Sequence, residues 1–180
     1  MEDKRLISEL YDAIASSYEK LYGEEQLAKL SEIMKYLPER SFQAVLDAGC
    51  GTGLFFEKLS EIGREIIGLD LSWEMLRSAR GRACRFNVHL VRGDLEHLPF
   101  HSECFDLVVS VTVLPVSSSN EQALLELGRV LSSNGLAALT VPKEAKIVEE
   151  VLRTLRQLNI GIRGFYEKSY IKDAVIIAER

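Results

Sequence analysis

The sequence lacks several features that define specialised classes of protein. Its three cysteines, Cys50, Cys84 and Cys104, are odd in number and form no C-x-x-C pair, which argues against a disulfide framework and a thiolate zinc site. No apolar run reaches membrane-spanning length, and the first residues, Met-Glu-Asp-Lys-Arg, lack the apolar core of a signal peptide. We therefore expect a cytoplasmic protein without a membrane segment.

An excess of basic residues is also absent. The chain carries 22 lysines and arginines against 27 aspartates and glutamates, a formal net charge of −5. Phosphate contacts supply most of the sequence-independent affinity for nucleic acids, so this balance argues against unaided nucleic-acid binding. With 47% hydrophobic and 27% charged residues over 180 positions, the composition is that of one folded domain.

Apolar residues near the N-terminus recur at helical spacing. Those of residues 4–22 lie three or four positions apart and predict a helix that Gly23 ends. A second helical pattern, formed by Leu27, Leu30, Met34 and Leu37, stops at Pro38. These two helices would form an N-terminal segment over residues 1–40.

From residue 44 onward, strand patterns and helix patterns alternate. We expect strands at residues 44–46, 65–71, 88–91, 105–113 and 136–141. Helices are expected at 54–59 with Gly63 as its stop, at 73–83 with Ser72 as its N-cap, at 120–133 before Gly135, and at 147–158. Two further strands, at 162–166 and 174–178, have no helix between them, and a short connection requires them to be antiparallel.

This order predicts an α/β fold. We expect a doubly wound, Rossmann-like sheet, mostly parallel with an antiparallel C-terminal hairpin strand and with helices on both faces. The chain is interpreted as one domain over residues 1–180, in which residues 41–180 form the sheet core.

A glycine-rich turn follows the first strand. In Asp47-Ala48-Gly49-Cys50-Gly51-Thr52-Gly53, three alternate glycines let the backbone turn sharply and come close to a ligand. Open α/β sheets bind ligands where a strand hands over to a helix in this way. A merely tight strand-to-helix turn is the alternative explanation.

Two carboxylates stand at the ends of the next strands. Asp70 can accept hydrogen bonds from both hydroxyls of a ribose, and Asp94 can accept one from an adenine amino group beside the apolar wall of Leu95. Taken singly, Asp70 could be a helix N-terminal charge and Asp94 an ordinary turn residue. Their order after the glycine turn favours a nucleoside site.

Four segments together resemble the successive motifs of class I S-adenosylmethionine-dependent methyltransferases, especially the small ubiquinone-biosynthesis-like branch. They read LDAGCGTG, IIGLDLS, VRGDLEHLPF and FDLVVSVTVL. The resemblance implies that Asp47 and the loop with Gly49, Gly51 and Gly53 hold the methionine end of S-adenosylmethionine. It further implies that Asp70 and Leu71 lie at the ribose and that Asp94 and Leu95 lie at the adenine. It also makes residues 1–40 a helical lid, with Tyr11 and Tyr18 over the cofactor, although both tyrosines could be core residues.

The chemistry requires few catalytic groups. The cofactor is itself the electrophile, so the protein must chiefly orient an acceptor. The segment from Ser110 to Val116 lacks the Asn/Asp-Pro-Pro-aromatic tetrad that grips a planar amide or exocyclic amine in relatives, which argues against methylation of a base amine or a glutamine. Relatives often carry His or Glu where Leu114 and Pro115 stand, so no catalytic residue is assigned. His97 and His101 flank Pro99 in an expected loop, and we expect no metal there.

The sequence does not identify the methyl acceptor or the partners of the protein. Only residues 142–161 separate the fifth strand from the tail hairpin, too few for a cap, which favours a macromolecular acceptor, RNA or protein, over a small metabolite. In related small enzymes, a zinc-binding activator subunit covers an exposed edge strand. The corresponding strand here would be Asn87 to Val91, in which Val88 and Leu90 could form an apolar face. A homodimer is the alternative. A non-catalytic cofactor-binding scaffold and a nicotinamide-dependent oxidoreductase are further alternatives, but the latter's G-x-G-x-x-G requires glycine where Leu54 stands.

Overall fold

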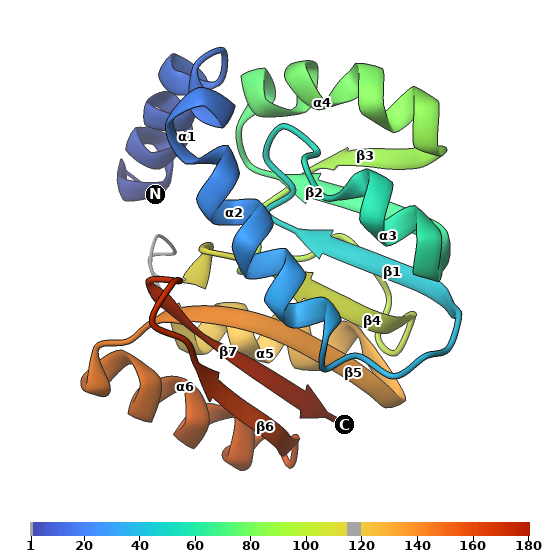
Figure 1. The fold of residues 1–180 in the computed structure, drawn as a ribbon, viewed down its shortest axis with the longest axis vertical. Coiled ribbons are helices and arrows are strands. Elements are labelled where there is room, and N and C mark those ends of the chain that lie inside the picture. The colour runs from blue at the N-terminus through green and yellow to red at the C-terminus, as the bar shows by residue number, and fades with distance from the viewer. Residues whose placement is uncertain (1, 115–119) are drawn as a thin grey trace.

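The computed structural model describes residues 2–114 and 120–180, and Figure 1 shows a central sheet flanked by helices. Its helices are α1 (Glu2–Ile14), α2 (Tyr18–Met34), α3 (Phe56–Ile62), α4 (Trp73–Phe86), α5 (Asn120–Val130) and α6 (Ala145–Gln157). Its strands are β1 (Phe42–Ala48), β2 (Gly63–Asp70), β3 (Val88–Arg92), β4 (Phe105–Ser110), β5 (Leu131–Pro142), β6 (Gly161–Glu167) and β7 (Asp173–Glu179). None of the described helices combines the length and apolar character needed to cross a bilayer.

The strand order confirms the predicted fold. The seven strands lie in the order β3-β2-β1-β4-β5-β7-β6. Neighbours from β3 to β5 are parallel, whereas β7 is antiparallel to both β5 and β6. The chain winds outward from β1 to β3 and then restarts at β4 on the other side of β1. This reversal opens a crevice at the carboxyl ends of β1 and β4, where ligands bind in doubly wound sheets.

Two hydrophobic cores lie on opposite faces of the sheet. Val45 and Leu46 are adjacent and both fully buried, and they point into different cores because side chains alternate along a strand. Buried residues of α2, α3 and α4 form one core with the sheet, and those of α5 and α6 form the other. Burial on both faces explains why β1 and β4 read as continuous apolar runs.

The prediction that Gly23 ends the first helix is wrong. The helical pattern is interrupted earlier, where Ser17 donates from its N–H and its hydroxyl to the carbonyl of Ile14. The next helix, α2, then continues through Gly23, which is buried. Packing of α2 through Leu30 and Ile33 offsets the ~1 kcal/mol helix cost of one glycine.

Three strand boundaries also differ from the predictions. The helix expected to reach residue 133 ends at Val130, because buried Leu131 already pairs with Phe105 in the sheet. The strand expected to reach residue 113 ends at Ser110, and Thr112 adopts a φ of 63° that a strand does not allow. Gly63 follows α3 as predicted, but its extended backbone starts β2 directly.

The outermost strand β3 is an edge, as predicted, but its apolar face is not available. Val88 is buried, and Leu90 packs against the core formed with α4. This edge therefore offers the unpaired backbone N–H and C=O groups of β3 to a partner, rather than an apolar surface.

Two glycine substitutions should separate helix propensity from backbone strain. Gly23→Ala should raise the free energy of unfolding by about 0.5–1 kcal/mol, because an added Cβ meets only Glu19 Cβ at 3.6 Å inside α2. Gly53→Ala should lower it, because that residue has a φ of 74° and its Cβ would lie 2.4 Å from the Phe56 ring. Urea unfolding of both variants measures the two changes, and a destabilised Gly23→Ala protein would show that α2 does not continue through this position.

Candidate functional site

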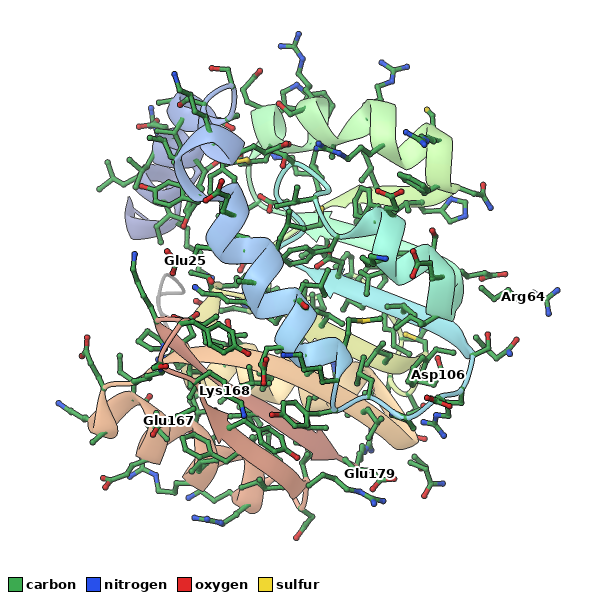
Figure 2. All side chains as sticks on the ribbon, in the orientation of Figure 1. Glu25, Arg64, Asp106, Glu167, Lys168 and Glu179 are labelled. Atoms are coloured by element: carbon green, nitrogen blue, oxygen red, sulfur yellow. The ribbon has the colours of Figure 1, made fainter. Side chains whose placement is uncertain are left out.

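One pocket lies at the carboxyl ends of β1, β2, β3 and β4, beneath the N-terminal helices. Its empty volume is about 760 Å³, part of it open to solvent. In Figure 2, Arg64 and Asp106, near the starts of β2 and β4, lie at the opposite end of the strands from α1. Of the residues predicted from the sequence, all but Asp47 and Gly53 line the pocket, namely Tyr11, Tyr18, Gly49, Gly51, Asp70, Leu71, Asp94 and Leu95.

The glycine turn after β1 has the backbone geometry that the sequence predicted. Gly49, Gly51 and Gly53 have φ values of 86°, 53° and 74°, a region that residues with a Cβ rarely adopt. A Cβ on Gly49 would also lie 2.2 Å from Val113 Cγ2, so glycine permits the close approach of β1 and the segment after β4. Gly53 packs on Phe56 and does not line the pocket, so its role is to allow the backbone conformation of the turn.

Asp70, at the end of β2, holds this turn in place. Its Oδ2 accepts a hydrogen bond from the Gly51 N–H at 2.8 Å, and its Oδ1 accepts one from the Ser72 N–H at 2.8 Å. Burial raises the pKa of Asp70 above its ordinary value, while these backbone donors oppose the rise. The carboxylate therefore presents its outer lone pairs to the pocket from a fixed position.

Asp47 is a buried carboxyl group without a partner. It is 1% exposed, and neither side-chain oxygen has a hydrogen-bond partner among the described residues. Burial, with a smaller contribution from the Asp70 charge, raises the pKa of Asp47 to about 8. A buried polar group without a partner is costly, so it requires an explanation beyond packing.

Asp94, at the end of β3, is engaged by a residue that the sequence did not reveal. Its Oδ2 lies 2.6 Å from the Lys4 ammonium, and its Oδ1 accepts the Glu96 N–H at 2.9 Å. The same ammonium lies 2.6 Å from Glu96 Oε2. A lysine on an amphipathic helix and a glutamate in a loop carry no signal that would link them.

The two predicted tyrosines lie together in the pocket wall. The Tyr11 and Tyr18 ring centroids are 6.3 Å apart, and both rings are partly buried. Burial is the main reason that the pKa of each phenol is raised, and the nearby Asp70 charge adds to it. Asp12 fixes α1 above them, because its Oδ1 accepts hydrogen bonds from the Ser72 hydroxyl and the Glu74 N–H.

A buried polar cluster supports the β4 side of the pocket. Thr112 lines the pocket with a φ of 63°, which is exceptional for a β-branched residue. Its hydroxyl accepts a hydrogen bond from the Lys29 ammonium at 2.9 Å, and this ammonium lies 2.8 Å from Asp173 Oδ2. Lys29 is also 3.2 Å from Glu25, which is labelled in Figure 2 and pairs with Lys172 before β7. The hydrophobic pattern gave no sign of this cluster, although the buried Lys29 directly precedes Leu30 of the predicted apolar stripe.

Comparison with known proteins agrees with this architecture. The chain matches the family described as "Methyltransferase domain" over residues 46–139. Malonyl-[acyl-carrier protein] O-methyltransferases from Enterobacter lignolyticus and Salmonella typhimurium are 36% and 33% identical to it over 138 and 147 residues. The alignments cover 77% and 82% of this chain but 54% and 57% of the relatives. The chain thus spans about half the length of the curated relatives it matches.

Solved structures share the fold at low sequence identity. One of them is a complex between the Haloferax volcanii Trm112 methyltransferase activator and a methyltransferase. Its similar chain superimposes with a TM-score of 0.79 at 17% sequence identity, and the match covers 94% of this chain and 96% of that chain. The [4+2]-cyclase SpnF has a TM-score of 0.84 at 17% identity, over 98% and 96%.

The sheet order and the pocket at the strand ends define a Rossmann-like fold of the kind found in class I methyltransferases. Within that class, the chain belongs to the methyltransferase domain family that its sequence matches. The resemblance stated from the four motifs is thereby confirmed.

The buried Asp47 carboxyl should make the free energy of unfolding depend on pH. Its pKa of about 8 in the folded chain lies above the ordinary value of 3.8, so the folded chain binds the extra proton between these values. The free energy of unfolding should therefore be highest below pH 4 for this group alone and fall as the pH rises towards 8. In Asp47→Asn this decrease should be lost, and the variant should be more stable than the parent at pH 8. Urea unfolding at pH 6 and pH 8 provides the measurement, and equal pH slopes in the two proteins would contradict the assignment.

Proposed function

We propose that this chain is an S-adenosylmethionine-dependent methyltransferase that binds its cofactor along the carboxyl ends of β3, β2, β1 and β4. The observation that carries the proposal is the convergence of Asp94, Asp70 and the glycine turn in one pocket, from three neighbouring strands and in sheet order. Such an order suits an elongated ligand made of a base, a sugar and a charged tail. The family match and the named relatives support the same cofactor.

The polar groups fit that cofactor piece by piece. Asp94 would accept the adenine amino group between Leu71 and Leu95, and Asp70 would accept the ribose hydroxyls. Gly49 and Gly51 would allow the methionine end to approach the backbone. Asp47 does not line the pocket, but its oxygens have no partner among the described residues, and a cationic amino group at the turn would favour the ionised carboxylate. Gly53 would act only through the shape of the turn. Residues 1–40 would form the lid, with Tyr11 and Tyr18 covering the sulfonium end.

The chain's own task is to bind, orient and exclude water. When bound, the cofactor supplies an electrophilic methyl group on its sulfonium. The segment after β4 presents Val111, Thr112 and Val113 to the pocket, next to Gly49. An acceptor held there would be aligned by apolar contacts and by Thr112, and such orientation can supply roughly 7–11 kcal/mol of the barrier.

We propose that the acceptor is presented by a macromolecule, RNA or protein, and that a partner completes the site. The helix α6, between β5 and β6, packs with α5 on a sheet face and so leaves the pocket without a cap from that segment. The named relatives act on malonyl-[acyl-carrier protein], which supports a group carried by a protein. The small metabolite remains the alternative acceptor. The acidic net charge of −5 makes RNA the weaker of the two macromolecules without a basic partner.

The partner we propose is a small zinc-binding activator subunit that pairs with the free backbone of β3. The fold shared with the methyltransferase in the Trm112 complex supports this choice, with a homodimer as the alternative. We expect the assembly to act in the cytoplasm. A non-catalytic cofactor-binding scaffold is a second candidate function. The fold by itself does not imply methyl transfer, because SpnF shares it and carries the name of a cyclase.

Cofactor binding tests the proposed function directly. Calorimetry should show binding of S-adenosylmethionine and its demethylated product, with no comparable binding of NAD. Asp70→Ala should weaken this binding by about 1.5–3 kcal/mol, the scale of hydrogen bonds to a charged group. The matched control is Asp106→Ala, because Asp106 likewise accepts two backbone N–H groups, from Gln43 and Ala44, but at the far end of the strands. Equal losses of affinity in both variants would remove Asp70 from the site, and NAD bound in place of S-adenosylmethionine would overturn the cofactor.

Label transfer tests the acceptor and the partner. We expect methyl-labelled S-adenosylmethionine to mark the RNA or protein fraction of a lysate, and only weakly with the purified chain alone. Addition of the proteins that co-purify with the chain should increase the transfer. Rapid labelling of a free metabolite by the partner-free chain would contradict both parts of the proposal, and cofactor binding without any label transfer would favour the scaffold.

A further inference from the structure

The Lys4 ammonium lies inside the pocket, between two carboxylates at the end of β3. It is 2.6 Å from Asp94 Oδ2 and 2.6 Å from Glu96 Oε2. All three residues line the pocket, and their side chains are only 22%, 28% and 8% exposed for Lys4, Asp94 and Glu96. This ion pair is therefore part of the pocket wall, unlike the Arg5–Glu9 pair on the same helix, whose side chains are 82% and 55% exposed.

The contact leaves Asp94 with both oxygens engaged. Oδ1 accepts the Glu96 N–H, and Oδ2 faces Lys4, with His97 Nδ1 a further 3.5 Å neighbour. Burial tends to lower the pKa of Lys4, but hydrogen bonds to Asp94 and Glu96 more than offset this, so its pKa is raised. The ammonium is thus charged at neutral pH, and its attraction to the two carboxylates persists in the absence of a ligand.

A second contact fixes α1 across the pocket. Asp12, eight residues after Lys4, accepts hydrogen bonds from the Ser72 hydroxyl and the Glu74 N–H at the start of α4. Ile7 and Tyr11 lie between these two anchors and line the pocket. The helix α1 is consequently tied to the loop after β3 at one end and to the loop after β2 at the other.

We propose that Lys4 is a latch that an adenosine-containing ligand must displace, because its ammonium occupies the Asp94 oxygen that the adenine amino group would use. Binding then exchanges the ion pair for a base contact and frees the N-terminal turns of α1, while Asp12 keeps the other end in place. This inference rests on the proposed function, which assigns Asp94 to the adenine. It makes the observed affinity depend on the fraction of molecules in which the latch is open.

Two variants that break the same ion pair distinguish a latch from a structural contact. Lys4→Met removes the charge and keeps the Asp94 acceptor, so S-adenosylhomocysteine should bind about threefold to tenfold more tightly and associate faster. Asp94→Ala also removes the pair but loses the acceptor, so the same ligand should bind at least about tenfold more weakly. A purely structural pair would shift both variants in the same direction. Arg5→Met, which alters only the exposed pair, is the matched control and should bind as the parent does.

The only tryptophan provides the readout. Trp73 begins α4 two residues after Leu71, which lines the pocket, and it is 53% exposed, so its fluorescence reports arrival of the ligand rather than movement of α1. Stopped-flow fluorescence of the full chain gives association rates, and calorimetry gives affinities. If the parent binds S-adenosylhomocysteine while Lys4→Met binds it equally or more weakly, the latch is refuted and the proposed function stands. If the parent binds neither S-adenosylhomocysteine nor S-adenosylmethionine, the proposed function fails and the latch fails with it.

Discussion

The hydrogen bonds of the Asp70 carboxylate connect the parts of the pocket to one another. One oxygen holds the Gly51 N–H of the turn after β1, and the other holds the Ser72 N–H at the start of α4. Ser72 in turn donates its hydroxyl hydrogen to Asp12 of α1. The glycine turn, the end of β2 and the N-terminal helix are therefore joined through the side chains of Asp70, Ser72 and Asp12. Burial raises the pKa of Asp70, and its backbone donors oppose that rise.

Much of this arrangement could be predicted because it depends on local sequence. Continuous apolar runs marked β1 and β4, which are buried on both faces, and the glycine spacing marked the positive φ values of the turn. Ser72 was recognised as an N-cap from its place before a helical stripe, and its side chain does accept the Met75 N–H at 3.1 Å. The order of these signals along the chain placed Asp70 and Asp94 at neighbouring strand ends, where both line the pocket.

One group of errors arises where a helix packs through polar side chains. The buried face of α2 includes Gln26, Lys29 and Glu32, whereas Leu27, which began the predicted apolar stripe, is 43% exposed. Glu32 is compensated by Lys35 and by the hydroxyls of Tyr36 and Tyr170, so its pKa is lowered to about 2 despite burial. Hydrophobic periodicity cannot detect a face that is stabilised by ion pairs with residues more than a hundred positions away. The same limit concealed Lys4, whose partners lie about ninety positions along the chain.

The Lys29–Asp173 pair has a consequence for how the protein is made. Asp173 is the first residue of β7, a strand that inserts between β5 and β6, and with Lys29 it supports Thr112 at the pocket wall. A ribosome therefore releases α2 and the first parallel strands long before the group that completes their pocket has been synthesised. Before β7 is synthesised, Lys29 lacks its Asp173 partner. Thr112 then lacks one of the contacts that support its unusual backbone conformation. The native contacts on the β4 side of the pocket thus require residues from near both ends of the chain.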